Sequence, residues 1–307
     1  MAAALIALLL ATAPASPGDP VCGADGREPA RRALLDELNR ARREAGAVPV
    51  APHPAVCEFA RERAARVRET GDPSASLGQL QRMVRGMYEN GYHPHAWTQS
   101  VIIGDPLTDR LEQWRAVRPD SYREAVEGDF EHAGIGVETL HGQPVFAVVL
   151  ALSRCTVERR RADELADLET VRREALSAVN RLRAGRGLDP VASDPDLDRA
   201  AQDHAAAMRD GGFYSHRGVG GSSPRERARA AGYSQGAAVS ENIAKGIFGG
   251  AEVVERWMGS RGHRDNLLDP KMRAVGLGVA VGDRDHPGEC VEAFWAQLLG
   301  GAAPADG

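Results

Sequence analysis

The sequence predicts an α+β protein built from two tandem copies of one domain. The first observation is an internal repeat: residues 34–68 and 175–209 align without a gap at a constant shift of 141, and 13 of the 35 positions are identical. The second is the order of patterns in each copy, where helical periodicity comes first and two strand-like runs come last. A tandem duplication explains both observations.

Each copy opens with a helix, predicted from apolar residues at helical spacing, and continues after a Gly/Pro turn with a second helix. The second helix starts at Pro54 in copy one and at Asp194-Pro195 in copy two, where Asp suits the N-cap and Pro the first turn. A polar, glycine-rich middle leads to a short helix that carries Trp114 or Trp257, each predicted to anchor the core. Two strand-like runs close each copy: AGIGVET with PVFAVVLAL, and AVGLGVAVG with CVEAFWAQLL.

These patterns place the two domains at residues 30–155 and 174–300. Residues 156–173 join them and predict a helical connector that continues into copy two, because they lack Gly and Pro and carry apolar residues at helical intervals. The terminal residues 301–307, GAAPADG, predict a disordered tail.

The N-terminus predicts a signal peptide over residues 1–15. An apolar core runs from Ala2 to Ala11, and Ala13-Pro14-Ala15 fits the small-x-small cleavage pattern. The core is shorter than the roughly 20 residues that a transmembrane helix needs. The alternative is a buried N-terminal helix. The prediction is therefore a secreted or periplasmic protein without a transmembrane segment in the mature chain.

Charge argues against one class of partner. The formal net charge is −5, and no stripe of basic residues alternates with aromatic residues. Proteins that bind nucleic acid usually present a basic face. Hydrophobic residues make up 43% of the chain, which is enough for packed cores. We therefore expect a globular protein with no nucleic-acid partner.

The four cysteines are Cys22, Cys57, Cys155 and Cys290. No pair has the CxxC spacing of a zinc ribbon or a thioredoxin-type motif. An even count behind an export signal permits two disulfides, with three possible connectivities. The sequence favours one bridge among the first three.

The candidate functional residues gather in copy two. His216 follows the second helix, Glu241 lies in the run SENIAKGIFGG, and His263 follows the tryptophan helix where a glycine-flanked turn would expose it. Two imidazoles and one carboxylate are the protein ligands of an open zinc site, and they also serve acid–base chemistry. Their separations of 25 and 22 residues carry no local signature, so three unrelated polar residues remain the alternative.

Copy one has lost all three of these residues. At the repeat shift His216 falls on Ala75, Glu241 falls on Ser100, and His263 falls near Asp120 and Ser121. His204, on the second helix, becomes Arg63 in the same way. The joint loss favours a shared site in copy two.

The motifs of copy two resemble the CAP superfamily of cysteine-rich secretory, antigen-5 and pathogenesis-related class 1 proteins. They occur in order: SH after a helix, SENIA, W-x5-HRDNLL, GLGV and FWAQLL. The likeness is greatest to the bacterial SCP-domain branch, and copy one is similar in a degenerate form. The resemblance implies a three-layer α-β-α sandwich with a central antiparallel sheet in each copy.

The resemblance also implies a cleft in which two His and two Glu residues can bind a divalent metal such as zinc. Carried over, these are His216, His263 and Glu241, whereas Ser260 stands at the position of the second Glu. The implied metal affinity is therefore modest. Ser240 replaces the usual Gly before Glu241, which is a mild change.

The remaining polar residues have simpler interpretations. His204 shares a helical face with apolar residues, so we expect a core histidine or one that supports the site from behind. For His93-Pro94-His95 a turn is favoured over a metal clip. Asn266 is expected to bond to backbone near the site.

Two classes of function follow. The first is a non-enzymatic binding or effector module for a small-molecule, lipid or cell-envelope ligand, and the sequence favours it because no GxSxG motif is present. The second is a metal-dependent or Ser/His/Glu hydrolase of the peptidase type, because Ser215, Ser240 and Ser260 lie beside the candidate residues.

Overall fold

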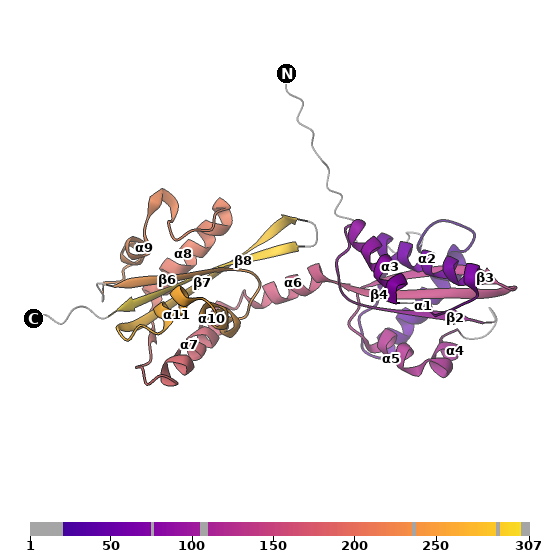
Figure 1. Ribbon diagram of the computed structural model, residues 1–307, viewed down its shortest axis with the longest axis horizontal. Helices are drawn as coiled ribbons and strands as arrows, with labels where there is room; N and C mark the ends of the chain where they lie inside the picture. The colour runs from indigo at the N-terminus through magenta and orange to yellow at the C-terminus, as the bar shows by residue number, and fades with distance from the viewer. Residues whose placement is uncertain (1–20, 75–76, 105–109, 235–237, 287–288, 302–307) are drawn as a thin grey trace, which may run out of the picture. The chain divides into compact units, whose positions relative to one another are not determined.

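The computed structural model describes residues 21–74, 77–104, 110–234, 238–286 and 289–301. The expected signal peptide and residues 302–307 of the expected tail lie outside this part of the chain. Gly301, the first residue of the expected tail, is the last residue of a strand. The chain divides into two compact units between Thr156 and Val157 (Figure 1). In the described part, no helix combines the length and apolar character needed to cross a bilayer.

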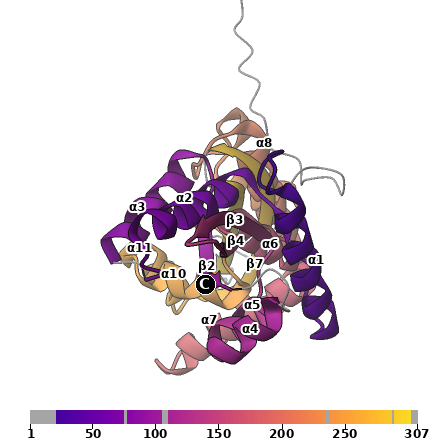
Figure 2. The same ribbon diagram turned by 90° about the vertical axis from the view of Figure 1, so that its right-hand side faces the viewer.

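Unit 1 consists of five helices and four strands within its described residues. They are α1 (Glu28–Glu44), β1 (Ala51–Pro52), α2 (Pro54–Thr70), α3 (Leu77–Glu89), β2 (Pro94–Ile103), α4 (Arg110–Val117), α5 (Pro119–Glu127), β3 (His132–Leu140) and β4 (Gln143–Ser153). The sheet order is β1-β3-β4-β2, antiparallel except for the two-residue pairing of β1 with β3. In Figure 2, α2 and α3 lie on one side of this sheet and α4 and α5 on the other.

Unit 2 repeats this order after α6 (Arg154–Glu164), within which the chain passes from one unit to the next. Its further elements are α7 (Leu168–Ala184), β5 (Ala192–Ser193), α8 (Pro195–Gly211), the 3₁₀ turn η1 (Val219–Gly221), α9 (Pro224–Ala230), β6 (Val239–Lys245), α10 (Gly250–Met258), α11 (Arg261–Leu267), β7 (Met272–His286) and β8 (Glu289–Gly301). The sheet order β5-β7-β8-β6 matches that of unit 1.

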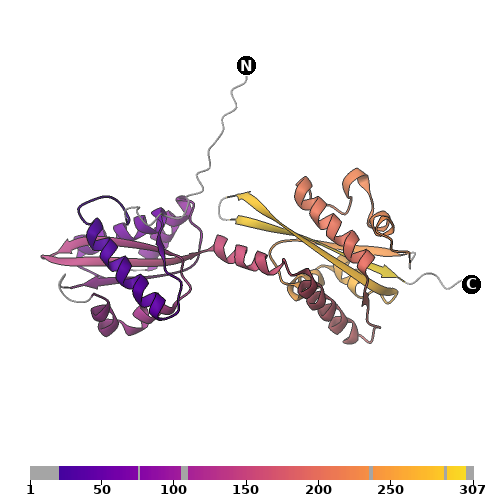
Figure 3. The same ribbon diagram turned by 180° about the vertical axis from the view of Figure 1, so that it is seen from behind.

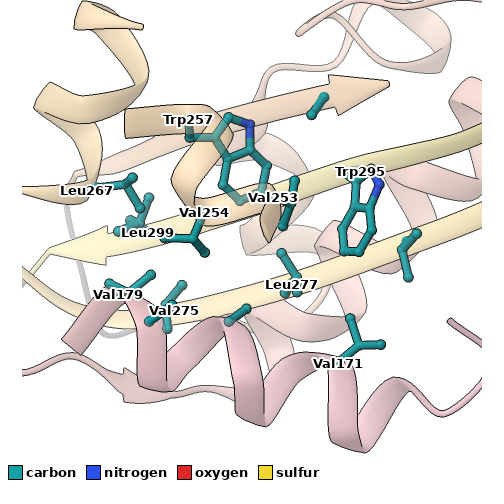
Figure 4. Close-up of a cluster of buried hydrophobic side chains, with 14 of the residues drawn as sticks. Val171, Val179, Val253, Val254, Trp257, Leu267, Val275, Leu277, Trp295 and Leu299 are labelled. Atoms are coloured by element: carbon teal, nitrogen blue, oxygen red, sulfur yellow. The ribbon is translucent and has the colours of Figure 1, made fainter. Parts of the chain in front are cut away.

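Two hydrophobic clusters make unit 2 a three-layer sandwich. On one face of the sheet, α8 and α9 enclose a cluster that contains Leu197, Met208 and Leu298. On the other face, α7 and α10 enclose a cluster that contains Trp257 of α10 and Trp295 of β8, both of which are buried (Figures 3 and 4). The three-layer α-β-α architecture expected from the sequence is confirmed, and Trp114 and Trp257 are core residues as predicted.

The repeated residues hold equivalent structures in the two units. Arg42 is fully buried, and its guanidinium donates to the carbonyl oxygens of Val48, Ala125, Gly128 and Phe130. Its counterpart Arg183 is equally buried, and it donates in the same way to the carbonyls of Asp189, Leu267, Asp269 and Met272. Each arginine thus ties the end of its first helix to the segment that enters the third strand.

The GxG motif near the start of β3 and β7 allows a close approach of helix and sheet. A Cβ on Gly134 would lie 2.1 Å from the carbonyl oxygen of Val56, and one on Gly276 would lie 2.1 Å from the carbonyl carbon of Leu197. Only glycine permits such contact between a strand and the backbone of a packed helix. In the sheets, Gly134 pairs with Val149 and Gly276 with Leu298, which fixes the equivalence of the two registers.

Four expectations need correction. The polar, glycine-rich middle of each copy contains a strand that the sequence did not predict, β2 in unit 1 and β6 in unit 2. Pro94, expected in a turn, is the first residue of β2. The connector is two helices, because the Asp167 side chain accepts from the backbone N–H of Thr170 and caps a new helix start. His263 lies inside α11, half-buried, and not in an exposed turn.

A disulfide joins Cys22 and Cys57 across 35 residues, which confirms one bridge among the first three cysteines. It ties the segment before α1 to α2. No cysteine of the described chain is free. The bridge fits the expectation of an oxidising compartment.

Candidate functional site

The site is built around the buried carboxylate of Glu241 on β6, whose side chain is only 1% exposed. Its Oε1 lies 2.8 Å from Nδ1 of His216, and its Oε2 accepts from the Arg227 guanidinium on α9. A buried carboxylate is stable only when its oxygens are paired. Both oxygens of Glu241 are paired, so this residue has a fixed orientation.

His216 lies in the loop between α8 and α9, and its side chain is 54% exposed. The loop is held from beneath: Arg227 Nη1 donates to the carbonyl of His216 over 3.1 Å, and Nε2 of His204 lies 3.0 Å from the carbonyl of Ser215. Because the Glu241 carboxylate can only accept, Nδ1 of a neutral His216 carries the proton and Nε2 keeps a lone pair.

His204 supports this arrangement from the core of α8. It is 1% exposed, and its Nε2 lies 3.9 Å from Glu241 Oε2. Burial lowers the pKa of His204 below its usual value, which keeps the imidazole neutral. Its Nδ1 is buried without a hydrogen-bond partner. The expectation of a core histidine behind the site is confirmed.

His263 is the second imidazole, presented by α11. Burial, followed by the charge of His216, lowers its pKa below the usual value. The carbonyl oxygen of His263 accepts from Nδ2 of Asn242, the residue that follows Glu241 on β6, over 3.3 Å. The fold thus brings His216 and Glu241 into direct contact, and it holds the backbone of His263 against the residue next to Glu241 on β6. Ser260, at the position of the absent second Glu, precedes α11, and its side chain makes no capping hydrogen bond.

A chain of amide side chains connects α11 to β6. Asn266 Nδ2 donates to the carbonyl oxygen of Glu241 over 3.1 Å and to Oδ1 of Asn242 over 2.9 Å. Asn242 Nδ2 donates to Oε1 of Gln297 over 3.0 Å and to the carbonyl of His263 over 3.3 Å. The predicted backbone bond of Asn266 is confirmed. We refer to Asn242, Asn266 and Gln297 as the amide network.

Sequence reasoning missed Arg227, although a signal was present. Ser223 and Glu226 form a capping box that starts α9. A helix start at this point places Arg227 in the first turn, close to the loop of His216. Arginine is abundant throughout this chain, so the residue type alone carried little information.

Strand register also corrects the counterpart of Glu241 in unit 1. The equivalent residues Val149 and Leu298 pair with Gln99 and Glu241 respectively, so Gln99, and not Ser100, occupies the Glu241 position. One extra residue in copy two before β6 causes the slip. A shift of one residue matters because it moves a side chain to the opposite face of the sheet.

The buried pair in unit 1 has a different character. Arg63, the counterpart of His204, is 1% exposed and its Nε donates to Oε1 of Gln99 over 3.2 Å. A cation with a neutral amide therefore replaces the imidazole and carboxylate of unit 2. Ala75, aligned with His216, lies outside the described residues. Unit 1 keeps a polar contact at this position and lacks the acid–base groups.

The donor set fits a divalent metal only in part. The two imidazoles suit zinc, with Nε2 of His216 directed away from its carboxylate partner. Glu241 does not offer a free oxygen, because Arg227 and His216 occupy both. Among the described residues, no group of three or more His, Cys, Asp or Glu side chains is arranged to hold a metal.

The three serines beside the site lack the geometry of an activated nucleophile. Ser215 Oγ accepts from the backbone N–H of Arg217 over 3.0 Å. Ser240 Oγ is buried and has no hydrogen-bond partner. No hydrogen bond joins the hydroxyl of Ser215, Ser240 or Ser260 to an imidazole in the part of the chain that the structure describes.

Comparison with known proteins assigns the family. The sequence profile of the cysteine-rich secretory protein family (CAP) matches residues 35–151 and 176–297, which is most of both units. The chain belongs to the CAP family. The two matched segments also support the tandem duplication, since each corresponds to one unit of the structure.

Two curated relatives match about a third of this chain. The chain is 34% identical to the Bacillus subtilis protein YkwD over 106 residues, which is 34% of this chain and 41% of YkwD. It is 29% identical over 110 residues to the membrane protein YlbC of the same organism, covering 36% of this chain and 32% of YlbC. The match thus spans less than half of the length of either relative.

Solved CAP structures are similar at low identity. An extracellular protein of Bacillus anthracis with an SCP domain is 18% identical, with a TM-score of 0.39, over 56% of this chain and 62% of that one. An outer surface protein of Borrelia burgdorferi is 20% identical, with a TM-score of 0.35, over 41% of this chain and 89% of that one. The TM-scores and sequence identities of both structures are low. The family assignment therefore rests on the match to the CAP sequence profile.

Proposed function

We propose that this protein is a secreted, non-enzymatic CAP-domain binding protein that engages its ligand at the His216–Glu241–His263 site of unit 2. The observation that carries the proposal is the fixed Glu241 carboxylate, locked between His216 and Arg227. A carboxylate held in this way orients an imidazole, and it is poorly suited to attack a substrate or to shuttle protons. Among the described residues, no hydroxyl of the three serines beside the site is hydrogen-bonded to an imidazole, which agrees with a binding role.

The surface beside His216 supports an amphipathic ligand, such as a lipid or cell-envelope molecule. The α8–α9 loop exposes Tyr214 by 47% and Val219 by 75%, although both are large hydrophobic residues. Arg217 is exposed between them. Hydrogen bonds within the loop, including Gly218 N to Ser222 O at 2.9 Å, hold it in shape. The loop thus offers apolar side chains and a charged one, which an amphipathic ligand would need.

We also propose that a divalent metal such as zinc can occupy this site with modest affinity. His216 and His263 would hold the metal, and Glu241 would orient His216 from behind without ligating. Bound zinc would supply a Lewis-acidic contact for an oxygen atom of the ligand. Two protein ligands are fewer than the three of catalytic zinc sites, which is why the affinity is modest.

The test combines calorimetric titration of the full chain with zinc at pH 5.5 and 7.5 and a screen of peptide and ester substrates. We expect weaker zinc binding at pH 5.5, because protons compete for the imidazoles, and no turnover at either pH. Turnover that disappears in the His263→Ala variant would instead establish the hydrolase class. Zinc binding that is equal at both pH values would exclude the two imidazoles as ligands.

A further inference from the structure

We infer that the amide network is a positioning device for His263, and that it belongs to the binding site and not to the fold. This inference rests on the proposed function of the site. The network joins the two elements that carry the site residues: β6 with Glu241 and α11 with His263. Asn242 and Gln297 are 0% and 1% exposed, so their hydrogen bonds are shielded from water.

The hydrogen bonds of the network end on the backbone of the site residues themselves. Asn266 holds the carbonyl of Glu241, and Asn242 holds the carbonyl of His263, while the two asparagines are bonded to each other. Hydrophobic packing is non-directional and allows a helix to slide on a sheet, whereas hydrogen bonds fix distance and angle. The network therefore sets where α11 places the imidazole relative to Glu241.

Unit 1 shows that the same helix–sheet contact forms without this network. Strand register places Ser100 at the Asn242 position and Val148 at the Gln297 position. There, Ser100 Oγ lies 2.7 Å from Ser121 Oγ on α5, so a contact between two hydroxyls stands in place of the amides. The unit that lacks the imidazoles thus also lacks the amides, although its sandwich is intact. A purely structural network would be needed in both units.

The network also leaves a polar atom unsatisfied, which a fold-stabilising device would avoid. Gln297 Nε2 is buried without a hydrogen-bond partner. Partly satisfied buried networks contribute less to stability than apolar packing of the same shape. Replacement of the buried amides by the residues of unit 1 should therefore leave the stability of the fold nearly unchanged and weaken ligand binding at the site.

The experiment converts unit 2 to the unit 1 pattern with Asn242→Ser and Gln297→Val in the full chain. We expect the melting temperature to stay near that of the unaltered protein and zinc affinity to fall by about tenfold or more, as for other residues that orient metal ligands. The matched control is Ser100→Ala, which breaks the corresponding contact in unit 1 and should leave zinc affinity unchanged.

A double-mutant cycle separates positioning from a general structural effect. In a His263→Ala background the Asn242→Ser, Gln297→Val pair should weaken zinc binding no further, because its effect passes through His263. Additive losses, or unchanged zinc affinity in the pair variant, would overturn the inference. If the unaltered protein binds no zinc, the proposed metal site fails, and the ring-proton NMR shifts of His263 decide instead. They should move in the pair variant and not in Ser100→Ala, and shifts that do not move would refute positioning.

Discussion

At the scale of single residues, the geometry of the site depends on the partners of the buried Glu241 carboxylate. Glu241 is buried with a cation, Arg227, and with the neutral imidazole of His204 at 3.9 Å. A buried ion pair stabilises little relative to apolar packing, but removing one partner leaves an uncompensated charge. The pairing therefore serves the geometry of the site more than the stability of the unit.

Arg227→Ala should have opposite effects on stability and on zinc binding. Loss of the cation leaves the buried Glu241 carboxylate without its charged partner, so the free energy of unfolding of unit 2 should fall by about 3–5 kcal/mol. The freed Oε2 becomes available as a ligand, so zinc should bind more tightly to the folded protein. Urea unfolding and calorimetry measure the two effects, with Arg229→Ala on the exposed side of α9 as the control. Weaker zinc binding in Arg227→Ala would contradict this account of Glu241.

His53 predicts a pH dependence for unit 1. Burial and the charge of His132 lower its pKa from 6.5 to about 4 in the folded state. The unfolded chain therefore binds a proton that the folded chain rejects, and stability falls as the pH drops from about 6.5 towards 4. The ring Nδ1 accepts from the backbone N–H of Ala55 as the N-cap of α2.

The His53→Asn variant retains a capping side chain without a titrating group. Its unfolding free energy should fall less between pH 6.5 and 4 than that of the unaltered protein, and His95→Asn at an exposed position should change nothing. An equally steep pH profile in His53→Asn would show that another group dominates.

At the scale of elements, the amphipathic helices and the closing strand pairs could be predicted because their patterns are long and periodic. Strand β6 could not, because it has seven residues and carries Ser240, Glu241 and Asn242 in sequence. Such a run lacks alternation of polar and apolar residues, and its strand form is imposed by pairing with β8. That His216 and Glu241 lie together could be predicted, because copy one lacks both residues. Arg227 was not predicted, because the capping box beside it marks a helix start and does not single out one arginine among many.

The GxG motif predicts a sharp effect of a single methyl group. In Gly276→Ala the added Cβ would overlap the backbone of α8 at Leu197, so the helix must move away from the sheet. We expect a loss of about 3 kcal/mol or more in unfolding free energy. Gly262→Ala, in α11 with no neighbour within 4 Å, should instead stabilise by about 0.5–1 kcal/mol. Thermal melting compares the two, and equal effects would refute the close-approach argument.

At the scale of the whole molecule, one fold occurs twice with different buried polar residues. Both units keep the buried arginine, the GxG approach and the tryptophan anchor, which together specify the sandwich. Unit 2 alone adds His216, Glu241 and His263. Unit 1 instead has Arg63 and Gln99 in its buried pair, together with the Cys22–Cys57 disulfide. The central claim is that ligand and metal binding reside in unit 2, through its two imidazoles.

The most direct test is a zinc titration of the full chain by calorimetry at pH 7.5, compared with a variant that carries His216→Ala and His263→Ala. The matched control is His95→Ala, which removes an exposed histidine from unit 1. We predict one zinc ion bound with modest affinity in the unaltered protein and in the control, and no binding in the double variant. Unchanged binding in the double variant, or none in the unaltered protein, would contradict the central claim.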